Sequence, residues 1–359
     1  MRFLVVKLSS IGDIVHTLPA VAALRKAYPN SSIDWVVERS ASAILDANPT
    51  VNEIIKVDTR KWRKGLLKRK VWQDIVSAVT KLKSKNYDLV FDFQGLLKSG
   101  LIVALSGAKK RLGFSNDGLR EEASRFFLTH QIVIDKKAHI IEKNLQLVKA
   151  LGVVADRYDF PIAVSQADES YIDKQLELYN LQHFVIINPG GGWTTKLWPL
   201  ARYAELADRI FERFKLRSLV TFGPGEEMMA EKIVAASRSG SVKAIVTSLK
   251  QFVALSRRAA LFIGGDTGPL HIAAACRTPI VGIYGPTEPI RNGPFDPLDI
   301  SVGLDLECRP NCYRRKCSTI ECMDISVSLV EDAVGRRLFQ TKLWQLNLSK
   351  NRLPDGVSH

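Results

Sequence analysis

Two glycine-rich loops in the second half of the chain carry residue types suited to binding phosphate. The stretch 264–271, Gly-Gly-Asp-Thr-Gly-Pro-Leu-His, follows an apolar run and precedes an alanine-rich one, which predicts a strand, a loop and a helix start. The first turn of a helix offers unpaired N–H groups and a positive dipole end, and glycines let a phosphate approach the backbone. The loop therefore predicts an anion site. The alternative is that Asp266 or Thr267 only caps the helix.

The second such loop spans residues 190–199. Gly190, Gly191 and Gly192 give access to the backbone, the two threonines that follow give hydroxyl groups, and Lys196 gives a positive charge. This combination suits a diphosphate, although a surface turn with an exposed lysine has the same composition. Because both loops belong to the same half of the chain, they favour one shared phosphorylated ligand.

The loop after the first predicted strand carries a candidate general base, Asp13. A carboxylate at the end of a strand could take a proton from a hydroxyl group, while capping of the next helix by Asp13 or Ser10 is the alternative. The loop lacks the three-glycine spacing of a dinucleotide-binding fingerprint, which disfavours an NAD or FAD enzyme. In the strand-to-helix stretch 91–100, Gln94 could bind sugar hydroxyls or cap the following helix.

Apolar periodicity predicts strands and helices that alternate through both halves of the chain, which is typical of parallel sheets covered on both faces. In the first half we expect strands at 3–7, 32–37, 53–57 and 89–93, and helices at 13–27 (kinked or starting late at Pro19) and 71–83. In the second half we expect strands at 184–187, 218–222, 242–246, 259–263 and 280–284, and helices at 168–179, 200–214, 226–237 and 251–258. The predicted α/β domains are residues 1–165 and 166–346, followed by a disordered tail at 347–359.

Composition and charge limit the class of protein. Apolar residues make up 46% and charged residues 25% of the chain, as in ordinary globular enzymes. No apolar run is long enough to cross a bilayer, and the short apolar N-terminus predicts a strand, so we expect a cytoplasmic protein. The net charge is +14, and residues 60–70 are densest in Lys and Arg. Such a patch favours nucleic acid, an anionic membrane surface or a phosphorylated substrate, and Trp62 within it suggests a covered surface.

The cysteines suggest a reduced protein. Cys276 stands alone in the alanine-rich helix, where it predicts a small core residue. The other four cysteines lie close together near the C-terminus, at Cys308, Cys312, Cys317 and Cys322. A structural metal is one interpretation of this cluster, but its spacings are looser than paired C-x-x-C knuckles, so free thiols in a surface loop are favoured.

Four motifs occur in an order that resembles the ADP-heptose:lipopolysaccharide heptosyltransferases, glycosyltransferase family 9. They are Lys7-x-Ser9-Ser10-x-Gly12-Asp13, Phe91-Asp92-x-Gln94-Gly95-Leu96-x-Lys98-Ser99, Lys196-x-Trp198-Pro199 and Asp266-Thr267-Gly268-x-x-His271. Within the family, the stretches 34–38 and 60–64 are most similar to heptosyltransferase I. The resemblance spans roughly residues 1–300, and the combination is specific although each motif alone is modest.

The resemblance implies a GT-B fold, in which two Rossmann-like domains face a central cleft. It implies an inverting transfer of L-glycero-D-manno-heptose from ADP-heptose to Kdo–lipid A, without a catalytic metal, by a monomer at the cytoplasmic face of the inner membrane. Asp13 matches the family's catalytic base. The donor-side matches are Thr194, Thr195, Lys196, Glu227, Asp266, Thr267, Gly268, Leu270 and His271. The acceptor-side matches are Ser10, Gly12, Arg60, Arg63, Lys64, Gln94 and Arg120.

One departure and three alternatives accompany the resemblance. The segment 308–317 resembles the Cys-rich tails of heptosyltransferase II, so an enzyme that adds a later heptose is an alternative. Another GT-B enzyme, such as an epimerase, is close in chemistry. A basic nucleic-acid-binding protein is the alternative from a different class, but no recognised nucleic-acid module occurs and no nucleic-acid partner is expected.

Overall fold

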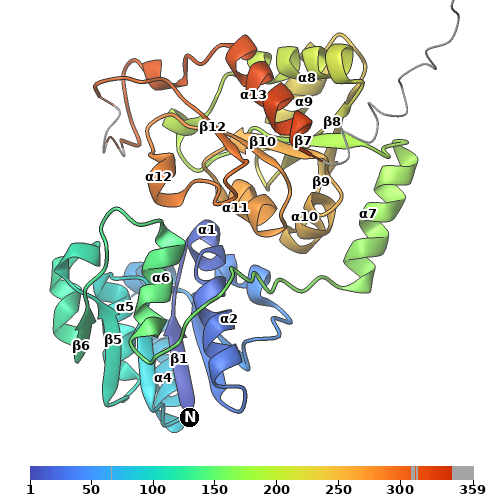
Figure 1. Ribbon diagram of the computed structural model, residues 1–359. Helices are drawn as coiled ribbons and strands as arrows, with labels where there is room; N and C mark the ends of the chain where they lie inside the picture. The colour runs from blue at the N-terminus through green and yellow to red at the C-terminus, as the bar shows by residue number, and fades with distance from the viewer. Residues whose placement is uncertain (66, 309–311, 313, 342–359) are drawn as a thin grey trace, which may run out of the picture. The chain divides into compact units, whose positions relative to one another are not determined.

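The computed structural model describes residues 1–341 except 66, 309–311 and 313 (Figure 1). The chain divides into two compact units, Met1–Ala163 and Val164–His359. This division falls near the predicted domain boundary at 165/166. The predicted disordered tail at 347–359 lies outside the described residues. Among the described residues, no helix is both long and apolar enough to cross a membrane.

The first unit is built on a six-stranded sheet in which all neighbouring strands are parallel, in the order β3-β2-β1-β4-β5-β6. The central strands β1 and β4 are nearly continuous apolar runs because both of their faces are covered. The six strands are β1 Arg2–Val6, β2 Ser32–Glu38, β3 Glu53–Val57, β4 Leu89–Asp92, β5 Lys110–Phe114 and β6 His130–Ile132.

Helices pack on this sheet in two groups. Leu82 of α4 and Ile102 of α5 join the strands in one buried cluster, while α2 packs against α6 (Figure 1). Right-handed crossovers explain this grouping, because the chain reverses its direction across the sheet after β3. The helices are α1 Ile11–Val15, α2 Leu18–Ala27, α3 Thr59–Lys64, α4 Arg69–Ser84, α5 Leu97–Leu105 and α6 Ile140–Lys149, with short 3₁₀ segments η1 Arg39–Leu45, η2 Asn116–Gly118 and η3 Glu122–Phe127.

The second unit repeats the same topology. Its order is β12-β11-β10-β7-β8-β9, which matches the first sheet when strands are counted from the start of each unit, and its neighbours are also all parallel. The strands are β7 Phe184–Asn188, β8 Arg217–Phe222, β9 Val242–Val246, β10 Leu261–Gly265, β11 Ile280–Ile283 and β12 Ile300–Val302.

The core of the second unit is shared by its sheet and the helices α8, α9 and α13 (Figure 1). Its apolar contacts include Trp198 against Tyr203 and the inner face of α13. The helices are α7 Gln166–Leu178, α8 Leu200–Phe214, α9 Glu227–Ala236, α10 Leu249–Ser256, α11 Gly268–Ala275, α12 Pro289–Asn292 and α13 Val327–Phe339, with 3₁₀ turns η4 Thr194–Lys196 and η5 Glu321–Met323.

The structure can be compared with three sequence-based expectations. The stretch 13–27 was expected to be kinked or to start late at Pro19, and it is broken at His16–Thr17, so that the long helix α2 starts at Leu18 with Pro19 in its first turn. Strands β5, β6 and β12 were not predicted, since β6 and β12 have only three residues each and β5, Lys110–Phe114, begins with two charged residues and contains a glycine. Trp62 is half-buried and packs against the core cluster of the first unit. Packing within the unit therefore accounts for a tryptophan among these basic residues without a partner that covers it.

Candidate functional site

The loops after β1 and β4 meet in the first unit at the point where the strand order reverses. Ligands of open parallel sheets bind at such a point, at the carboxyl ends of the strands. Gln94, after β4, is buried and accepts hydrogen bonds from the N–H groups of Leu8 (3.0 Å) and Ser9 (3.2 Å). Gln94 therefore holds the β1 loop in place through Oε1, and its role in binding the acceptor stays a prediction.

Asp13 lies in the short helix α1, directly after this loop. Its Oδ2 accepts hydrogen bonds from the N–H (2.9 Å) and the hydroxyl (3.2 Å) of Ser10, so the capping role is present. Its Oδ1 lies 3.2 Å from Nη2 of Arg120. The same carboxylate thus caps α1 through one oxygen and forms an ion pair through the other, while the neighbouring Gly12 is buried within α1.

The charge of Asp13 is set by opposing effects. Burial raises the pKa of the carboxyl, but the positive charges of Lys7 and Arg120 and the N–H of Ser10 outweigh burial and hold the pKa well below its usual value. Lys7 is 2% exposed, and its Nζ donates to the carbonyl oxygen of Phe93 (2.8 Å). Nothing in the sequence indicated a role for Lys7, because a lysine is usually exposed and its burial cannot be seen in the sequence. At neutral pH Asp13 is an anion, the form that a proton acceptor requires.

Arg120 reaches Asp13 because its backbone lies against Gly95. The N–H of Arg120 donates to the carbonyl oxygen of Gly95 (3.1 Å). Gly95 has φ +67°, and a Cβ there would press against Leu119 and the backbone of Arg120. A glycine is therefore required at this position both by backbone conformation and by close approach.

The predicted basic residues Arg60, Arg63 and Lys64 are exposed on α3. The start of α3 is anchored at the same edge of the sheet, since Glu38 at the end of β2 accepts a hydrogen bond from the N–H of Thr59 (3.1 Å). Asp58 caps the helix by accepting from the N–H of Lys61 (2.9 Å). Within the described part of the chain, none of these three cations forms an ion pair with Asp13, and their role in acceptor binding stays a prediction.

In the second unit, the loops after β7 and β10 meet at the equivalent reversal of strand order. Nζ of Lys196 lies 2.6 Å from Oδ2 of Asp266 and donates to the Asp266 carbonyl oxygen (3.1 Å). Oδ1 of Asp266 contacts Nε2 of His271 (3.2 Å) and accepts from Nδ2 of Asn292 (2.8 Å). The structure brings the two predicted phosphate loops together, with Asn292 of α12 as a member that the sequence did not indicate.

Electrostatics keep this cluster charged. Burial raises the pKa of Asp266, yet the hydrogen bond and charge of His271 and the charge of Lys196 hold it well below its usual value. Thr267 precedes α11 with extended backbone, and its side chain makes no capping hydrogen bond. Its buried hydroxyl has no hydrogen-bond partner among the described residues. Gly268 begins α11, a helix of eight residues, and Leu270 is buried within it. The Lys196 amine contacts the carbonyl oxygen and the carboxylate of Asp266, two residues before this helix begins.

Other predicted donor residues are placed differently. The hydroxyl of Thr195 is buried and donates to the carbonyl oxygen of Arg314 (2.8 Å), whereas Thr194 is exposed. Glu227 is exposed and accepts from the N–H of Gly225 (3.2 Å). Its neighbour Glu226 lies against Gly190, where any Cβ would collide with the Glu226 carboxylate. Glu226 is thus the acidic residue that contacts the glycine loop.

All five cysteines are free thiols. Cys322 is half-buried against the core of the second unit, and burial together with the neighbouring Cys312, Cys308 and Cys317 raises the pKa of its thiol. In the part of the chain that the structure describes, no three His, Cys, Asp or Glu side chains are arranged to hold a metal ion.

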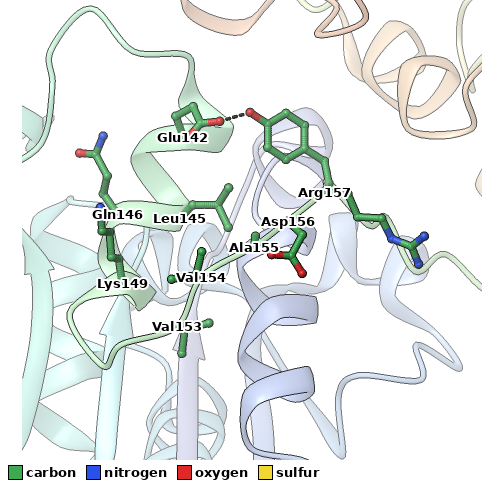
Figure 2. Close-up of a pocket in the computed structure, with 10 residues that line it drawn as sticks. Glu142, Leu145, Gln146, Lys149, Val153, Val154, Ala155, Asp156 and Arg157 are labelled. Carbon is green, nitrogen blue, oxygen red and sulfur yellow. Dashed lines mark hydrogen bonds between the residues drawn. The ribbon is translucent and has the colours of Figure 1, made fainter.

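A cavity of ≈ 560 Å³ lies elsewhere in the first unit (Figure 2). It is formed by α6 and the segment 153–158, and a hydrogen bond from the hydroxyl of Tyr158 to Glu142 connects the two walls. Its lining mixes apolar side chains such as Leu145 and Val153 with the charged Lys149 and Arg157. None of the predicted site residues lines this cavity.

Two Rossmann-like units, each with polar residues at the reversal of strand order, define a protein of the GT-B class. The family model described as glycosyltransferase family 9 (heptosyltransferase) matches residues 75–321. The chain belongs to glycosyltransferase family 9, and it is a glycosyltransferase.

Individual relatives agree with this assignment. The chain is 32% identical over 322 residues to lipopolysaccharide heptosyltransferase 1 of Pseudomonas aeruginosa, covering 89% of this chain and 88% of the relative. It is 30% identical to the protein of the same name from Escherichia coli K12, covering 80% and 89%. The solved structure of E. coli heptosyltransferase WaaC with ADP-2-deoxy-2-fluoro heptose superposes with a TM-score of 0.76 at 25% identity, covering 93% of this chain and 99% of that one. The overall resemblance is therefore to heptosyltransferase I.

Proposed function

We propose that this protein transfers L-glycero-D-manno-heptose from ADP-heptose to the Kdo–lipid A inner core of lipopolysaccharide. The family and the names of its relatives support heptosyl transfer in lipopolysaccharide synthesis. The observation that carries the donor assignment is the Lys196–Asp266 cluster. Asp266 is followed by Thr267, whose hydroxyl has no partner among the described residues, and then by the first turn of α11. These groups suit the diphosphate of a nucleotide-sugar.

In the proposed reaction, Asp13 removes the proton of an acceptor hydroxyl. The oxygen attacks the anomeric carbon as the bond to the donor phosphate breaks, and ADP leaves with the bonding electrons. One such displacement inverts the configuration at the anomeric carbon. Fixed positive charge stabilises the leaving diphosphate, and Lys196 with the N-terminus of α11 supplies it without a metal ion.

The transfer reaction itself tests the proposal. Purified protein is incubated with ADP-heptose and either Kdo–lipid A or a core that already carries one heptose. We expect transfer to Kdo–lipid A. Transfer only to the heptosylated core would assign the later step that the Cys-rich segment suggested, and release of free heptose without transfer to either acceptor would contradict the proposal.

We also propose that the enzyme works as a monomer at the cytoplasmic face of the inner membrane, held there peripherally. Trp72 and Val76 are exposed one turn apart on α4, and Leu97 and Leu101 are exposed one turn apart on the neighbouring α5. Lys and Arg at 68–70 begin α4, a combination typical of helices that lie on anionic lipid. Binding to anionic vesicles should fall when Trp72 and Val76 are both replaced by Ser. Unchanged sedimentation with vesicles would reject this face.

A further inference from the structure

The ring of Trp193 has two cations beside it. Nζ of Lys196 lies 4.5 Å from the ring centroid, and Cζ of Arg315 lies 4.9 Å from it. Lys196 belongs to the loop after β7, whereas Arg315 belongs to the Cys-rich segment more than a hundred residues later in the chain. A tryptophan face attracts a cation through its quadrupole, so Trp193 can hold both groups in place.

The position of Arg315 is supported on both sides. Before it, the carbonyl oxygen of Arg314 accepts the hydrogen bond from the buried hydroxyl of Thr195 (2.8 Å). After it, Ile320 and Cys322 pack against the core of the second unit. The N–H groups of Thr319 and Ile320 also bond to the Cys317 thiol, and these bonds lower its pKa. The segment is therefore attached to the β7 loop and to the core, with Arg315 between the two attachments.

The two cations differ in their electrostatic surroundings. Lys196 is paired with Asp266. Arg315 is exposed, and no carboxylate among the described residues forms an ion pair with it. Like charges repel, so two cations at one ring are stabilised when an anion lies between or beside them. A diphosphate, with charge on two adjacent groups, fits a lysine and an arginine better than a single phosphate does.

We propose that Arg315 is a second cation for the donor diphosphate, positioned by the Trp193 ring that Lys196 also contacts. This inference rests on the proposed donor site at Lys196. Lys196, in the loop after β7, supplies a point charge beside Asp266, the residue two positions before α11. Arg315, in the Cys-rich segment, supplies a planar guanidinium. The part of the Cys-rich segment around Arg315 then contributes to the proposed donor site.

The affinities of the ligand-free enzyme for ADP and for AMP test whether Arg315 contacts the diphosphate or only adds to the overall positive charge of the protein. Arg315→Ala should weaken ADP binding about tenfold, the loss of one charge-assisted contact, and weaken AMP binding much less. Arg314→Ala is the matched control, because it removes the same charge from the adjacent position while keeping the carbonyl that bonds to Thr195. We expect Arg314→Ala to bind ADP like the wild type. Arg315→Lys should recover part of the affinity.

The outcomes distinguish this inference from the donor site on which it rests. If Lys196→Ala weakens ADP binding and Arg315→Ala does not, the role of Arg315 is wrong while the donor site stands. Equal losses in Arg314→Ala and Arg315→Ala, or equal losses for ADP and AMP, would also overturn it. If neither Lys196→Ala nor Arg315→Ala alters ADP binding, the donor site itself is misplaced. Trp193→Ala should reproduce the loss of Arg315→Ala, and Trp193→Phe should reproduce it only in part.

Discussion

Each unit has an ion pair with one partner in the loop that follows its first strand, and our proposal gives the two pairs opposite roles. In the first unit, Asp13 and Arg120 are 3.2 Å apart, and 44% of the arginine side chain is exposed. In the second unit, Lys196 and Asp266 are 2.6 Å apart, and only 4% of the aspartate side chain is exposed. In our proposal the carboxylate is the working group in the first pair and the cation is the working group in the second. The shared strand order thus sets where a site forms, and the loop residues set its chemistry.

The exposure of the pairs explains how each can work. In our proposal, the exposed Arg120 exchanges its partner for an anionic acceptor, and the carboxylate of Asp13 then accepts a proton. The buried Asp266 is held by contacts from Lys196, His271 and Asn292, so we assign it the role of orienting the lysine and no role in proton transfer. Substitution of the four charged residues tests this difference.

The largest effect is expected for Asp13→Asn. The amide keeps the size of the side chain but cannot take a proton, so kcat should fall by roughly 10²- to 10⁴-fold. ADP binding, assigned to the second unit, should stay unchanged. Single-turnover transfer and ADP titration measure the two effects. An active Asp13→Asn enzyme would reject Asp13 as the base.

Asp266→Asn should mainly affect stability. Removing one partner of a buried pair costs about 3–5 kcal/mol, because it leaves the Lys196 charge uncompensated. The pKa of Asp266 is lower in the folded chain than in the unfolded chain, so its contribution is present above about pH 4 and is lost as acidification protonates it. Denaturant unfolding at neutral and acid pH should show a smaller acid destabilisation in the variant than in the wild type. Equal acid sensitivity would contradict the assignment.

Arg120→Ala should change stability by no more than about 1 kcal/mol, since its pair is partly exposed. Its effect should appear in the pH dependence of kcat/KM. Without the arginine charge, the pKa of Asp13 rises, because burial then meets less opposition. The acid limb of the profile should therefore move to higher pH. A profile that keeps its acid limb would show that Arg120 does not control the protonation of Asp13.

The smallest effect is expected from charge reversal at Arg63 and Lys64. Both are exposed on α3, and exposed charges are screened by salt. KM for the lipid acceptor should rise several-fold at low ionic strength and less at high ionic strength, while KM for ADP-heptose stays the same. A change only in the KM for ADP-heptose would show that these residues act on the donor and that their assignment to the acceptor is wrong.

Particular residues show what the sequence could and could not predict. The loops with Asp13 and Lys196 were located because an apolar strand ends just before each, and parallel sheets bring such ends to one edge. Strand β6 was missed because its three residues, His-Gln-Ile, show no apolar period. Glu226 and Glu227 are adjacent in sequence, and only the backbone path decides which one faces Gly190. The Thr195–Arg314 bond joins positions 119 residues apart, a contact that no local pattern contains.

The anomeric configuration of the product tests the proposed single displacement most directly. Wild-type protein is incubated with ADP-heptose and Kdo–lipid A, and the new glycosidic bond is examined by NMR. If Asp13 activates the acceptor for attack opposite the leaving ADP, the product has the configuration opposite to that of the donor. A product that retains the donor configuration would contradict the account, because retention requires a second displacement or a different geometry of attack.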